Sequence, residues 1–243
     1  MFFAFDVDGT LTPSRQQISP RFGDWFLNWI SVSQTRGDSI MLVTGSDRAK
    51  TVEQLGEEIV SAVRYCCNCM GNVVYYNNKL IHNYKFQYPK SLTEFLNKEL
   101  VRSVYSERCG NHIEDRGAML NFSTVGRLAN PEQRKRYNEW DKISGERLEI
   151  AGKINELFEK YNIVAQVAGE IGIDITAKGK DKSQCIKYMQ GDTILFFGDR
   201  MDDGGNDKPL ADVITQLQNG SKCYEVENWE ETWDILQNLN LAV

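Results

Sequence analysis

Two aspartates stand two residues apart directly after an apolar stretch at the start of the chain. Met1–Phe5 is apolar, and Asp6-Val7-Asp8-Gly9-Thr10 follows it. Side chains at positions i and i+2 of an extended chain point to the same side, so both carboxylates can face one point beyond a strand end. Neighbouring carboxylates repel each other unless a cation or a shared proton lies between them. The pentapeptide therefore predicts a Mg²⁺ site that acts on a phosphate, with an Asp-Gly turn carrying solvated acids as the alternative.

Three further groups of polar residues follow or adjoin other predicted strands. Thr44 and Ser46 end one strand, Lys182 begins a helix that returns to the sheet, and Asp199 ends another strand with Asp207 in the glycine-rich loop after it. Hydroxyls and helix amides hold phosphate oxygens, and a lysine supplies a fixed positive charge. Each group alone could be a helix cap, a surface lysine or a turn. Together they predict a phosphate-binding crevice at the carboxyl ends of an open sheet.

The elements that must position these residues alternate between strand and helix patterns. Short apolar runs predict strands at 1–5, 39–43, 63–67 and 193–197, and helical spacing of apolar residues predicts helices at 20–36, after Asp47, and at 182–189. A β-α-β-α-β order of this kind is typical of a doubly wound parallel sheet.

The pattern changes near residue 72 and stays different for about a hundred residues. A hairpin at 73–82, helices at 92–102 and 145–161, and strands at 112–114, 119–123, 164–167 and 171–176 predict a small α+β domain inserted into the sheet domain. We therefore expect an α/β protein with a Rossmann-like, doubly wound parallel-sheet core in two parts, 1–79 and 180–243. An α+β cap domain, 80–179, is expected between them.

Composition narrows the class of protein. The net charge is −6 over 243 residues, so the chain as a whole is not expected to bind nucleic acid. The longest apolar runs fall far short of the ~20 residues that span a bilayer, which predicts no membrane partner and a cytoplasmic protein. The six cysteines are expected to be reduced thiols, because Cys66 and Cys69 have no second pair to complete a zinc site. With two histidines, a Ser-His-Asp triad is not expected.

These motifs resemble those of the haloacid dehalogenase (HAD) superfamily, and more closely those of the eukaryotic-type phosphomannomutases. The resemblance covers nearly the whole chain. The stretches that carry it are Phe5-Asp6-Val7-Asp8-Gly9-Thr10-Leu11-Thr12 with Arg15, Gly45-Ser46-Asp47 with Glu53-Gln54-Leu55-Gly56, Gly117-Ala118-Met119-Leu120-Asn121 with Gly126-Arg127, Asp181-Lys182, and Phe196-Phe197-Gly198-Asp199 leading to Gly204-Gly205-Asn206-Asp207.

The resemblance implies a role for each matching residue. Asp6 is the nucleophile that becomes a phosphoaspartate, and Asp8 is the general acid/base whose backbone carbonyl also ligates Mg²⁺. Asp199 and Asp207 complete the metal site, and Lys182 holds the transferring phosphoryl group. The residues expected to bind substrate are Arg15, Thr44, Ser46, Arg116, Arg127, Arg134 and Asp174.

The reaction implied is the interconversion of mannose 6-phosphate and mannose 1-phosphate through an aspartyl-phosphate and a hexose 1,6-bisphosphate. A Mg²⁺-dependent sugar-phosphate phosphatase is the alternative, and a receiver-type phospho-acceptor domain is a third, which has no need of a cap. The resemblance also implies a cap that opens and closes over its substrate and a homodimer through the cap. The chain departs from the family at Gly172, where a serine is usual, at Cys69-Met70-Gly71, where Glu-Asn-Gly is usual, and at Asp202-Asp203. These departures leave the identity of the sugar open.

Overall fold

The computed structural model describes residues 1–239 and divides the chain into two compact units. The core unit contains Met1–Asn83 and the chain from Lys180 onward, and the insert unit contains Tyr84–Gly179. The insert thus starts at Tyr84 instead of residue 80. The last four residues of the expected core, 240–243, lie outside the described residues.

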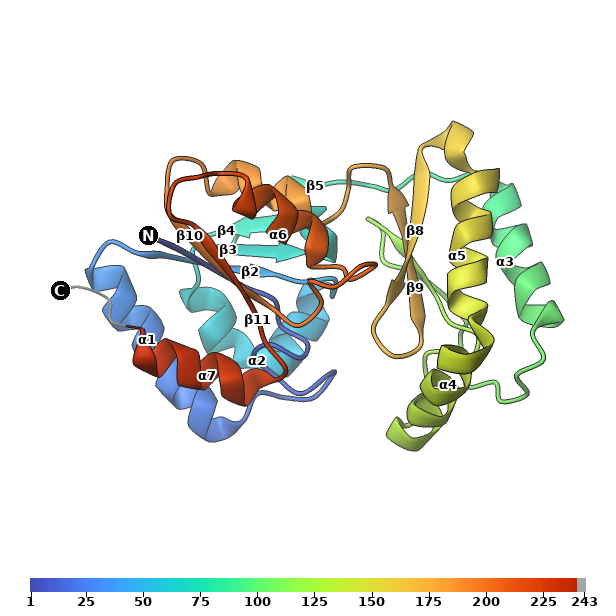
Figure 1. Cartoon of the computed structure of the whole chain (residues 1–243), viewed down its shortest axis with the longest axis horizontal. Helices are drawn as coiled ribbons and strands as arrows, with labels where there is room; N and C mark the ends of the chain where they lie inside the picture. The colour runs from blue at the N-terminus through green and yellow to red at the C-terminus, as the bar shows by residue number, and fades with distance from the viewer. Residues whose placement is uncertain (240–243) are drawn as a thin grey trace. The chain divides into compact units, whose positions relative to one another are not determined.

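The core unit is built on a seven-stranded sheet with the strand order β11-β10-β1-β2-β3-β4-β5 (Figure 1). The first five strands in that order are parallel, and β4 and β5 add an antiparallel hairpin at one edge. The whole hairpin therefore belongs to the core sheet, whereas the expected boundary at residue 80 cut through it. The strands are β1 (Phe2–Phe5), β2 (Ser39–Val43), β3 (Tyr65–Asn68), β4 (Val73–Tyr76), β5 (Lys79–Asn83), β10 (Ile194–Gly198) and β11 (Lys222–Glu225).

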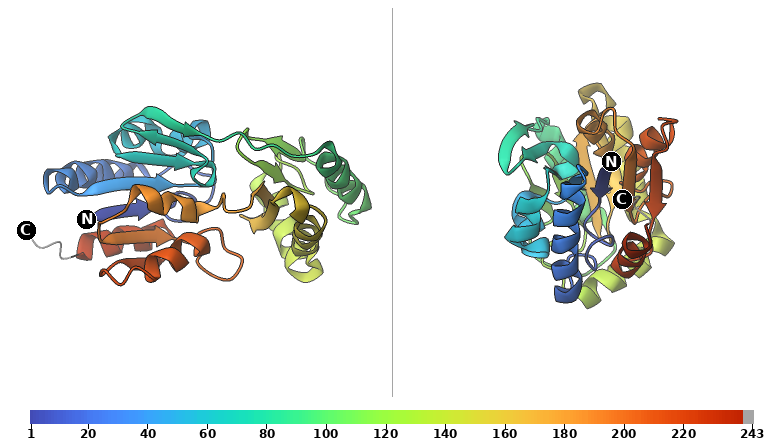
Figure 2. Two further views of the ribbon diagram at one scale, coloured as in Figure 1. Left: turned by 90° about the horizontal axis from the view of Figure 1, so that it is seen from above. Right: turned by 90° about the vertical axis from the view of Figure 1, so that its left-hand side faces the viewer.

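Helices cover both faces of this sheet (Figures 1 and 2). In β1, Phe3 and Phe5 pack into one apolar cluster with α1, α2 and α7, and Phe2 and Ala4 pack into another with η3 and α6. A strand buried on both faces reads as an unbroken apolar run, which is why Met1–Phe5 predicted it. The helices are α1 (Pro20–Thr35), α2 (Arg48–Ala62), α6 (Lys208–Thr215) and α7 (Trp229–Asn238), with the 3₁₀ segments η1 (Cys69–Gly71) and η3 (Lys182–Tyr188).

Two helix starts follow directly from the sequence. Pro20 occupies the first turn of α1, where its missing N–H costs nothing. Asp47 caps α2 by accepting the backbone N–H of Lys50 at 2.8 Å, as expected. The helix expected over 182–189 is present as a 3₁₀ helix over Lys182–Tyr188.

The insert unit has its own antiparallel sheet, in the order β6-β7-β9-β8. Apolar side chains of α3 and α5 pack with those of β7, β8 and β9 in a separate core. The strands are β6 (Ile113–Asp115), β7 (Leu120–Phe122), β8 (Ile163–Ala168) and β9 (Gly172–Ala177), and the helices are α3 (Lys90–Arg102), α4 (Pro131–Ser144), α5 (Glu146–Leu157) and the 3₁₀ segment η2 (Glu159–Tyr161).

Helix α4 was not predicted, because few of its side chains are apolar. Its start is nevertheless encoded: Asn130 and Gln133 form a reciprocal capping box, and Pro131 opens the first turn. The expected α+β insert and doubly wound parallel-sheet core are both present, so the predicted fold class is confirmed. Within residues 1–239, no helix combines the length and apolar character needed to cross a bilayer.

Candidate active site

Three carboxylates meet at the carboxyl edge of the core sheet. Asp6 follows β1, Asp199 follows β10, and Asp207 precedes α6; one oxygen of each lies within 4.8 Å of the others. Strands β1 and β10 pair in parallel, with Phe5 beside Phe197, so both end at the same edge. Asp6 is only 3% exposed and Asp207 is fully buried. Residues nearly two hundred positions apart in sequence thus form one acidic cluster.

Lys182 is the cation of this cluster. Its Nζ donates to Asp6 Oδ1 at 2.6 Å and to Asp207 Oδ1 at 2.8 Å, and its side chain is fully buried. Burial by itself would lower the pKa of Lys182, but Asp207 and Asp6 outweigh burial and raise the pKa above its ordinary value. The ammonium is therefore fixed as a charged donor between two carboxylates.

The cluster carries more negative than positive charge. With every group ionised, three carboxylates and one ammonium sum to −2, and all four groups are removed from most of the solvent. Burial raises the pKa of Asp6 well above its ordinary value, against the opposing charge of Lys182, and Asp207 and Asp199 raise it further. Burial and then Asp207 raise the pKa of Asp199 to about 7. Hard oxygen donors with this excess charge fit a divalent metal ion.

Two glycines bring backbone against these carboxylates. At Gly9, with φ +84°, a Cβ would overlap the carboxylate of Asp199. At Gly198, a Cβ would lie 2.7 Å from Cγ of Asp207. Any side chain at either position would displace a member of the acidic cluster, which explains the glycines of both motifs.

Asp8 lies beside the cluster and is held through one carboxylate oxygen. Its Oδ1 accepts the backbone N–H of Arg15 at 2.6 Å and the side-chain amide of Gln54 at 2.9 Å. Its Oδ2 accepts the hydroxyl of Ser46 at 3.5 Å, the outer limit of a hydrogen bond. The Asp6-Asp8 pair thus consists of one carboxylate bonded to lysine and one bonded to amides.

Thr44 and Ser46 occupy the loop between β2 and α2. The backbone N–H of Ser46 donates to Thr44 Oγ1 at 3.0 Å. A turn with left-handed backbone braces the loop, since the N–H groups of Cys69 (φ 48°) and Met70 (φ 62°) donate to the carbonyls of Ser46 and Thr44 at 2.9 Å each. The Cys69-Met70-Gly71 turn therefore positions the hydroxyl loop.

The arginines of the insert form a second cluster, separate in the chain. Arg116 Nη2 lies 2.7 Å and Arg127 Nε 3.1 Å from the same oxygen of Glu114, and Arg134 Nε lies 3.0 Å from Glu170. The three guanidinium side chains are about nine-tenths buried. Three arginines contact two glutamates, and the charge of Asp174 also acts on Arg127, so acids and guanidinium groups are equal in number here.

Arg127 has hydrogen-bonding capacity that the described residues do not use. Its Nη1 is buried without a hydrogen-bond partner within residues 1–239, and its Nε is near Glu114 but not aligned for a hydrogen bond. Burial, and then the neighbouring charge of Arg116, lower the pKa of Arg127. A buried guanidinium with unused donors and a like-charged neighbour is suited to an anion such as a phosphate.

Asp174 lies close enough to influence Arg127 and is fixed from the next strand. The amide nitrogen of Asn121 donates to Asp174 Oδ1 at 2.5 Å, and the two residues are cross-strand partners of β7 and β9. A Cβ at Gly172 would lie 2.8 Å from that amide nitrogen. In this chain the Asn121 amide therefore lies against the face of Gly172 where a side chain would begin.

A model of the family described as "Eukaryotic phosphomannomutase" matches residues 31–240. The chain belongs to this family. Among curated phosphomannomutases, that of Dendrobium officinale is 34% identical, with 84% of this chain and 81% of the relative covered, and that of Arabidopsis thaliana is 32% identical, with 84% and 83% covered. The range matched to the phosphomannomutase family includes the three arginines of the insert and the core residues Lys182, Asp199 and Asp207.

Solved structures of lower identity share the fold. The C-terminal domain of a trehalose-6-phosphate phosphatase from C. albicans has a TM-score of 0.65 at 14% identity, with 94% of this chain and 79% of that chain covered. A haloacid dehalogenase-like hydrolase from Bacteroides thetaiotaomicron has a TM-score of 0.60 at 11% identity, with 97% and 98% covered. These structural similarities show that the chain has the HAD fold, and they carry no argument about its substrate.

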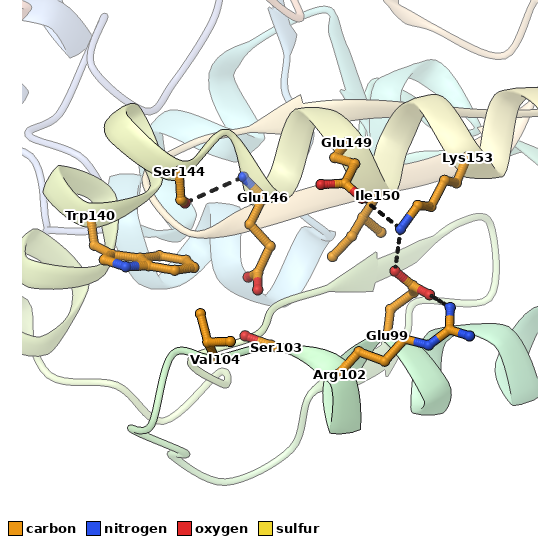
Figure 3. A pocket seen from close by; sticks show the side chains of 10 residues that line it. All are labelled: Glu99, Arg102, Ser103, Val104, Trp140, Ser144, Glu146, Glu149, Ile150 and Lys153. Carbon is orange, nitrogen blue, oxygen red and sulfur yellow. Dashed lines mark hydrogen bonds and ion pairs between the residues drawn. The ribbon is translucent and has the colours of Figure 1, made fainter.

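A pocket of about 380 Å³ lies on the helical side of the insert and shares no residue with either cluster (Figure 3). Its charged groups already pair with one another: Lys153 Nζ lies 3.0 Å from Glu99 Oε2 and 2.7 Å from Glu149 Oε1, and Arg102 Nη1 lies 2.7 Å from Glu99 Oε1. With Glu146, three carboxylates line the pocket against two cations, so it offers little to a phosphate. We therefore do not assign it to the substrate.

Three residues of these sites received no role from the sequence. Gln54 and Asn121 stood in motif stretches, and their amides now bind Asp8 and Asp174. Glu114, which joins two arginines, stood in no motif. The motifs that contain Gln54 and Asn121 were a usable signal for these two residues. The role of Glu114 on β6 depends on which arginines the fold brings to it, and the sequence does not show that.

Proposed function

We propose that this chain is a phosphomannomutase that interconverts mannose 6-phosphate and mannose 1-phosphate through an aspartyl-phosphate and a hexose 1,6-bisphosphate. Family membership and the curated relatives named phosphomannomutase support this reaction. The observation that carries it is the arginine cluster around Arg127. Such a cluster is suited to a second phosphate, and a mutase must hold one while the other reacts.

In the core unit, Asp6 is the proposed nucleophile. Its carboxylate attacks phosphorus, a new O–P bond forms, and the P–O bond to the sugar breaks. Asp8 gives a proton to the departing sugar oxygen and takes one back when that oxygen, or its counterpart at the other end of the sugar, attacks the aspartyl-phosphate. The Lys182 ammonium donates to Asp6, favours its ionised form against burial, and lies where it can neutralise charge on the phosphoryl group.

The metal of the core site is proposed to be Mg²⁺. Asp6, Asp199 and Asp207 with the backbone carbonyl of Asp8 would hold it, and the hard oxygen donors and the −2 charge of the cluster support this. When bound, Mg²⁺ polarises the phosphoryl oxygens and neutralises their charge. Hydrogen bonds from Lys182 hold the carboxylates of Asp6 and Asp207, and the close backbone of Gly9 and Gly198 confines those of Asp199 and Asp207.

In the insert unit, Arg116, Arg127 and Arg134 are proposed to bind the phosphate that is not reacting. Guanidinium groups make two parallel hydrogen bonds to phosphate, and the unpartnered Nη1 of Arg127 has a donor to spare. Asp174 is proposed to accept a sugar hydroxyl. Arg15, Thr44 and Ser46 are the substrate-binding residues proposed for the core.

One assay separates this reaction from the phosphatase alternative. Purified protein with Mg²⁺ is offered mannose 1-phosphate, with and without a hexose 1,6-bisphosphate, while mannose 6-phosphate and free phosphate are both followed. We expect mannose 6-phosphate to form faster than free phosphate, and the bisphosphate to accelerate it. Free phosphate without isomerisation would support the phosphatase instead.

We also propose a homodimer through the insert. Val101, Ile143 and Leu148 are 86%, 90% and 73% exposed on α3, α4 and α5, and Val104, at the edge of the pocket in Figure 3, is 85% exposed. Exposed apolar side chains on the three helices of the insert and on the loop after α3 favour an interface over a solvated face. Light scattering should give twice the 27.8 kDa chain mass, and Val104→Glu with Ile143→Glu should give the single mass.

A cytoplasmic location is the remaining part of the proposal. All six cysteines are free thiols, which is typical of a reducing compartment. Fractionation of cells with a marker for each compartment tests it directly.

A further inference from the structure

The Glu53-Gln54-Leu55-Gly56 stretch of α2 has a feature that the reaction above does not use. Gly56 has φ 80° and ψ 153°, so the helix is broken two residues after Gln54. The backbone carbonyl of Gln54 accepts the N–H of Ile18 at 2.8 Å. This hydrogen bond beside the break connects Gln54 to Ile18, in the segment that follows the Asp6–Thr10 motif.

The side chain of Gln54 reaches that same segment. It is only 1% exposed, and its Nε2 lies 2.9 Å from Asp8 Oδ1, 3.2 Å from Thr12 Oγ1 and 3.4 Å from the carbonyl of Gln16. A carboxylate oxygen and a backbone carbonyl only accept hydrogen bonds, so the nitrogen of the amide must face them. The orientation of the Gln54 amide is therefore set by its neighbours.

The two oxygens of Asp8 are held unequally as a result. Oδ1 accepts two amide N–H groups, from Arg15 and Gln54, at 2.6 and 2.9 Å. Oδ2 has the Ser46 hydroxyl at 3.5 Å. A carboxylate bonded firmly through one oxygen has a fixed plane, and its other oxygen points in a fixed direction.

We propose that Gln54 is a positioning residue for the general acid/base: it anchors Asp8 through Oδ1 and so directs Oδ2 to exchange the proton with the sugar oxygen. This inference rests on the proposed function of Asp8. A different role, in which Gln54 only braces the segment 12–18, would affect every phosphate substrate alike. The two roles therefore differ in how the effect depends on the leaving group.

The test compares leaving groups in the variant Gln54→Met, which keeps the length of the side chain and removes the amide. The rate of phosphoenzyme formation is measured in a single turnover with mannose 1-phosphate, phenyl phosphate and 4-nitrophenyl phosphate. A sugar alkoxide needs a proton to leave, whereas 4-nitrophenolate leaves without one. Because general acid catalysis contributes ~10²–10⁴-fold, we expect a loss of about 10- to 100-fold with the sugar phosphate and under about threefold with the nitrophenyl ester.

Three comparisons make the result decisive. Glu53→Gln, an exposed neighbour on α2, should behave as wild type with every substrate, and Asp8→Asn should show the same leaving-group pattern as Gln54→Met. Equal losses on all substrates, or none, would overturn the positioning role. If Gln54→Met does not fold, Gln54→Glu places a carboxylate against Asp8 Oδ1, and the same pattern is required of it.

Failure of the proposed function looks different. If wild-type protein forms a phosphoenzyme from the aryl esters but does not isomerise mannose phosphates, the mutase assignment fails. The leaving-group pattern is then still measured between phenyl and 4-nitrophenyl phosphate, and it still decides the role of Gln54.

Discussion

The core site and the insert cluster differ in which charge predominates: acids outnumber cations in the core, whereas arginines and acids are equal in number in the insert. In the core, three carboxylates surround one lysine, whereas in the insert three arginines share two glutamates and the nearby charge of Asp174. The first arrangement suits a cation together with a reacting phosphoryl group, and the second suits an anion that is held and not altered. A sugar bisphosphate would need both kinds of site, one for the phosphate that reacts and one for the phosphate that is held.

The two regions also differ in how their cations are bonded. Lys182 in the core donates to two carboxylates, while Arg127 in the insert keeps a buried Nη1 without a partner among the described residues. A group that acts at the reacting atoms gains from being fixed beforehand. A group that binds a ligand needs donors left for that ligand. The bonding pattern thus supports the proposed roles, with Lys182 at the reacting phosphate and Arg127 at the one that is held.

The largest expected effect comes from Asp6, the proposed nucleophile of the core. Asp6→Asn should abolish both the isomerisation of mannose phosphates and the hydrolysis of aryl phosphates, because an amide does not attack phosphorus. Both rates are measured on the same preparation, with circular dichroism as the check on folding. Substantial activity in this variant would remove the core site from the mechanism.

Removal of the metal should affect the core and spare the insert. EDTA should abolish both isomerisation and aryl phosphate hydrolysis, and Mg²⁺ should restore them.

Burial raises the pKa of Asp199 to about 7 from its ordinary 3.8, so the contribution of this group to stability is complete below pH 3.8 and is lost as the pH rises through 7.

Mg²⁺ needs the ionised form, so its stabilising effect should be greater at pH 8 than at pH 5. At a concentration 100 times Kd the expected gain is about 2.7 kcal/mol, followed as the shift of Tm. An equal shift of Tm at both pH values would contradict the assignment of Asp199 to the metal.

Loss of an insert arginine should break one activity and not the other. A charge-assisted bond to phosphate is worth about 1.5–3 kcal/mol, so Arg127→Ala should slow isomerisation about 10- to 100-fold. Hydrolysis of a small aryl phosphate should survive nearly unchanged. Arg136→Ala, on the exposed side of α4, is the matched control. A parallel fall in both activities would mean that the arginines do not form the second phosphate site.

The smallest expected effect concerns Gly172. A serine there would press its Cβ against the amide of Asn121 and displace the hydrogen bond to Asp174. We expect Gly172→Ser to lower the free energy of unfolding by about 1–2 kcal/mol, measured by urea denaturation. Gly152→Ser, where a Cβ meets nothing within 4 Å, should show no such loss from displaced contacts. Unchanged stability in Gly172→Ser would show that Asn121 has room to move.

The sequence by itself determined the core site to a large extent. The buried run at the start of the chain marks the strand that precedes Asp6 and Asp8. The period of two placed both carboxylates at one point, whereas the structure holds Asp6 in the acidic cluster and Asp8 on Arg15, Gln54 and Ser46. Lys182 and Asp199 were expected at the same edge because parallel strands end together, and the structure brings Lys182, Asp199 and Asp207 to Asp6. Short-range pattern and a simple sheet rule were sufficient to bring these charged groups to one edge, and their roles in the reaction stay a prediction.

Tertiary structure alone decided the rest. The hairpin β4-β5 joins the core sheet through pairing with β3, and local pattern does not specify which sheet a strand joins. Helix α4 buries few apolar side chains, so periodicity missed it. The bond between Gln54 and Asp8 and the shared contact of Arg116 and Arg127 with Glu114 join side chains whose neighbours are set by packing. Sequence spacing carries information about one element at a time, whereas these contacts exist only where elements meet.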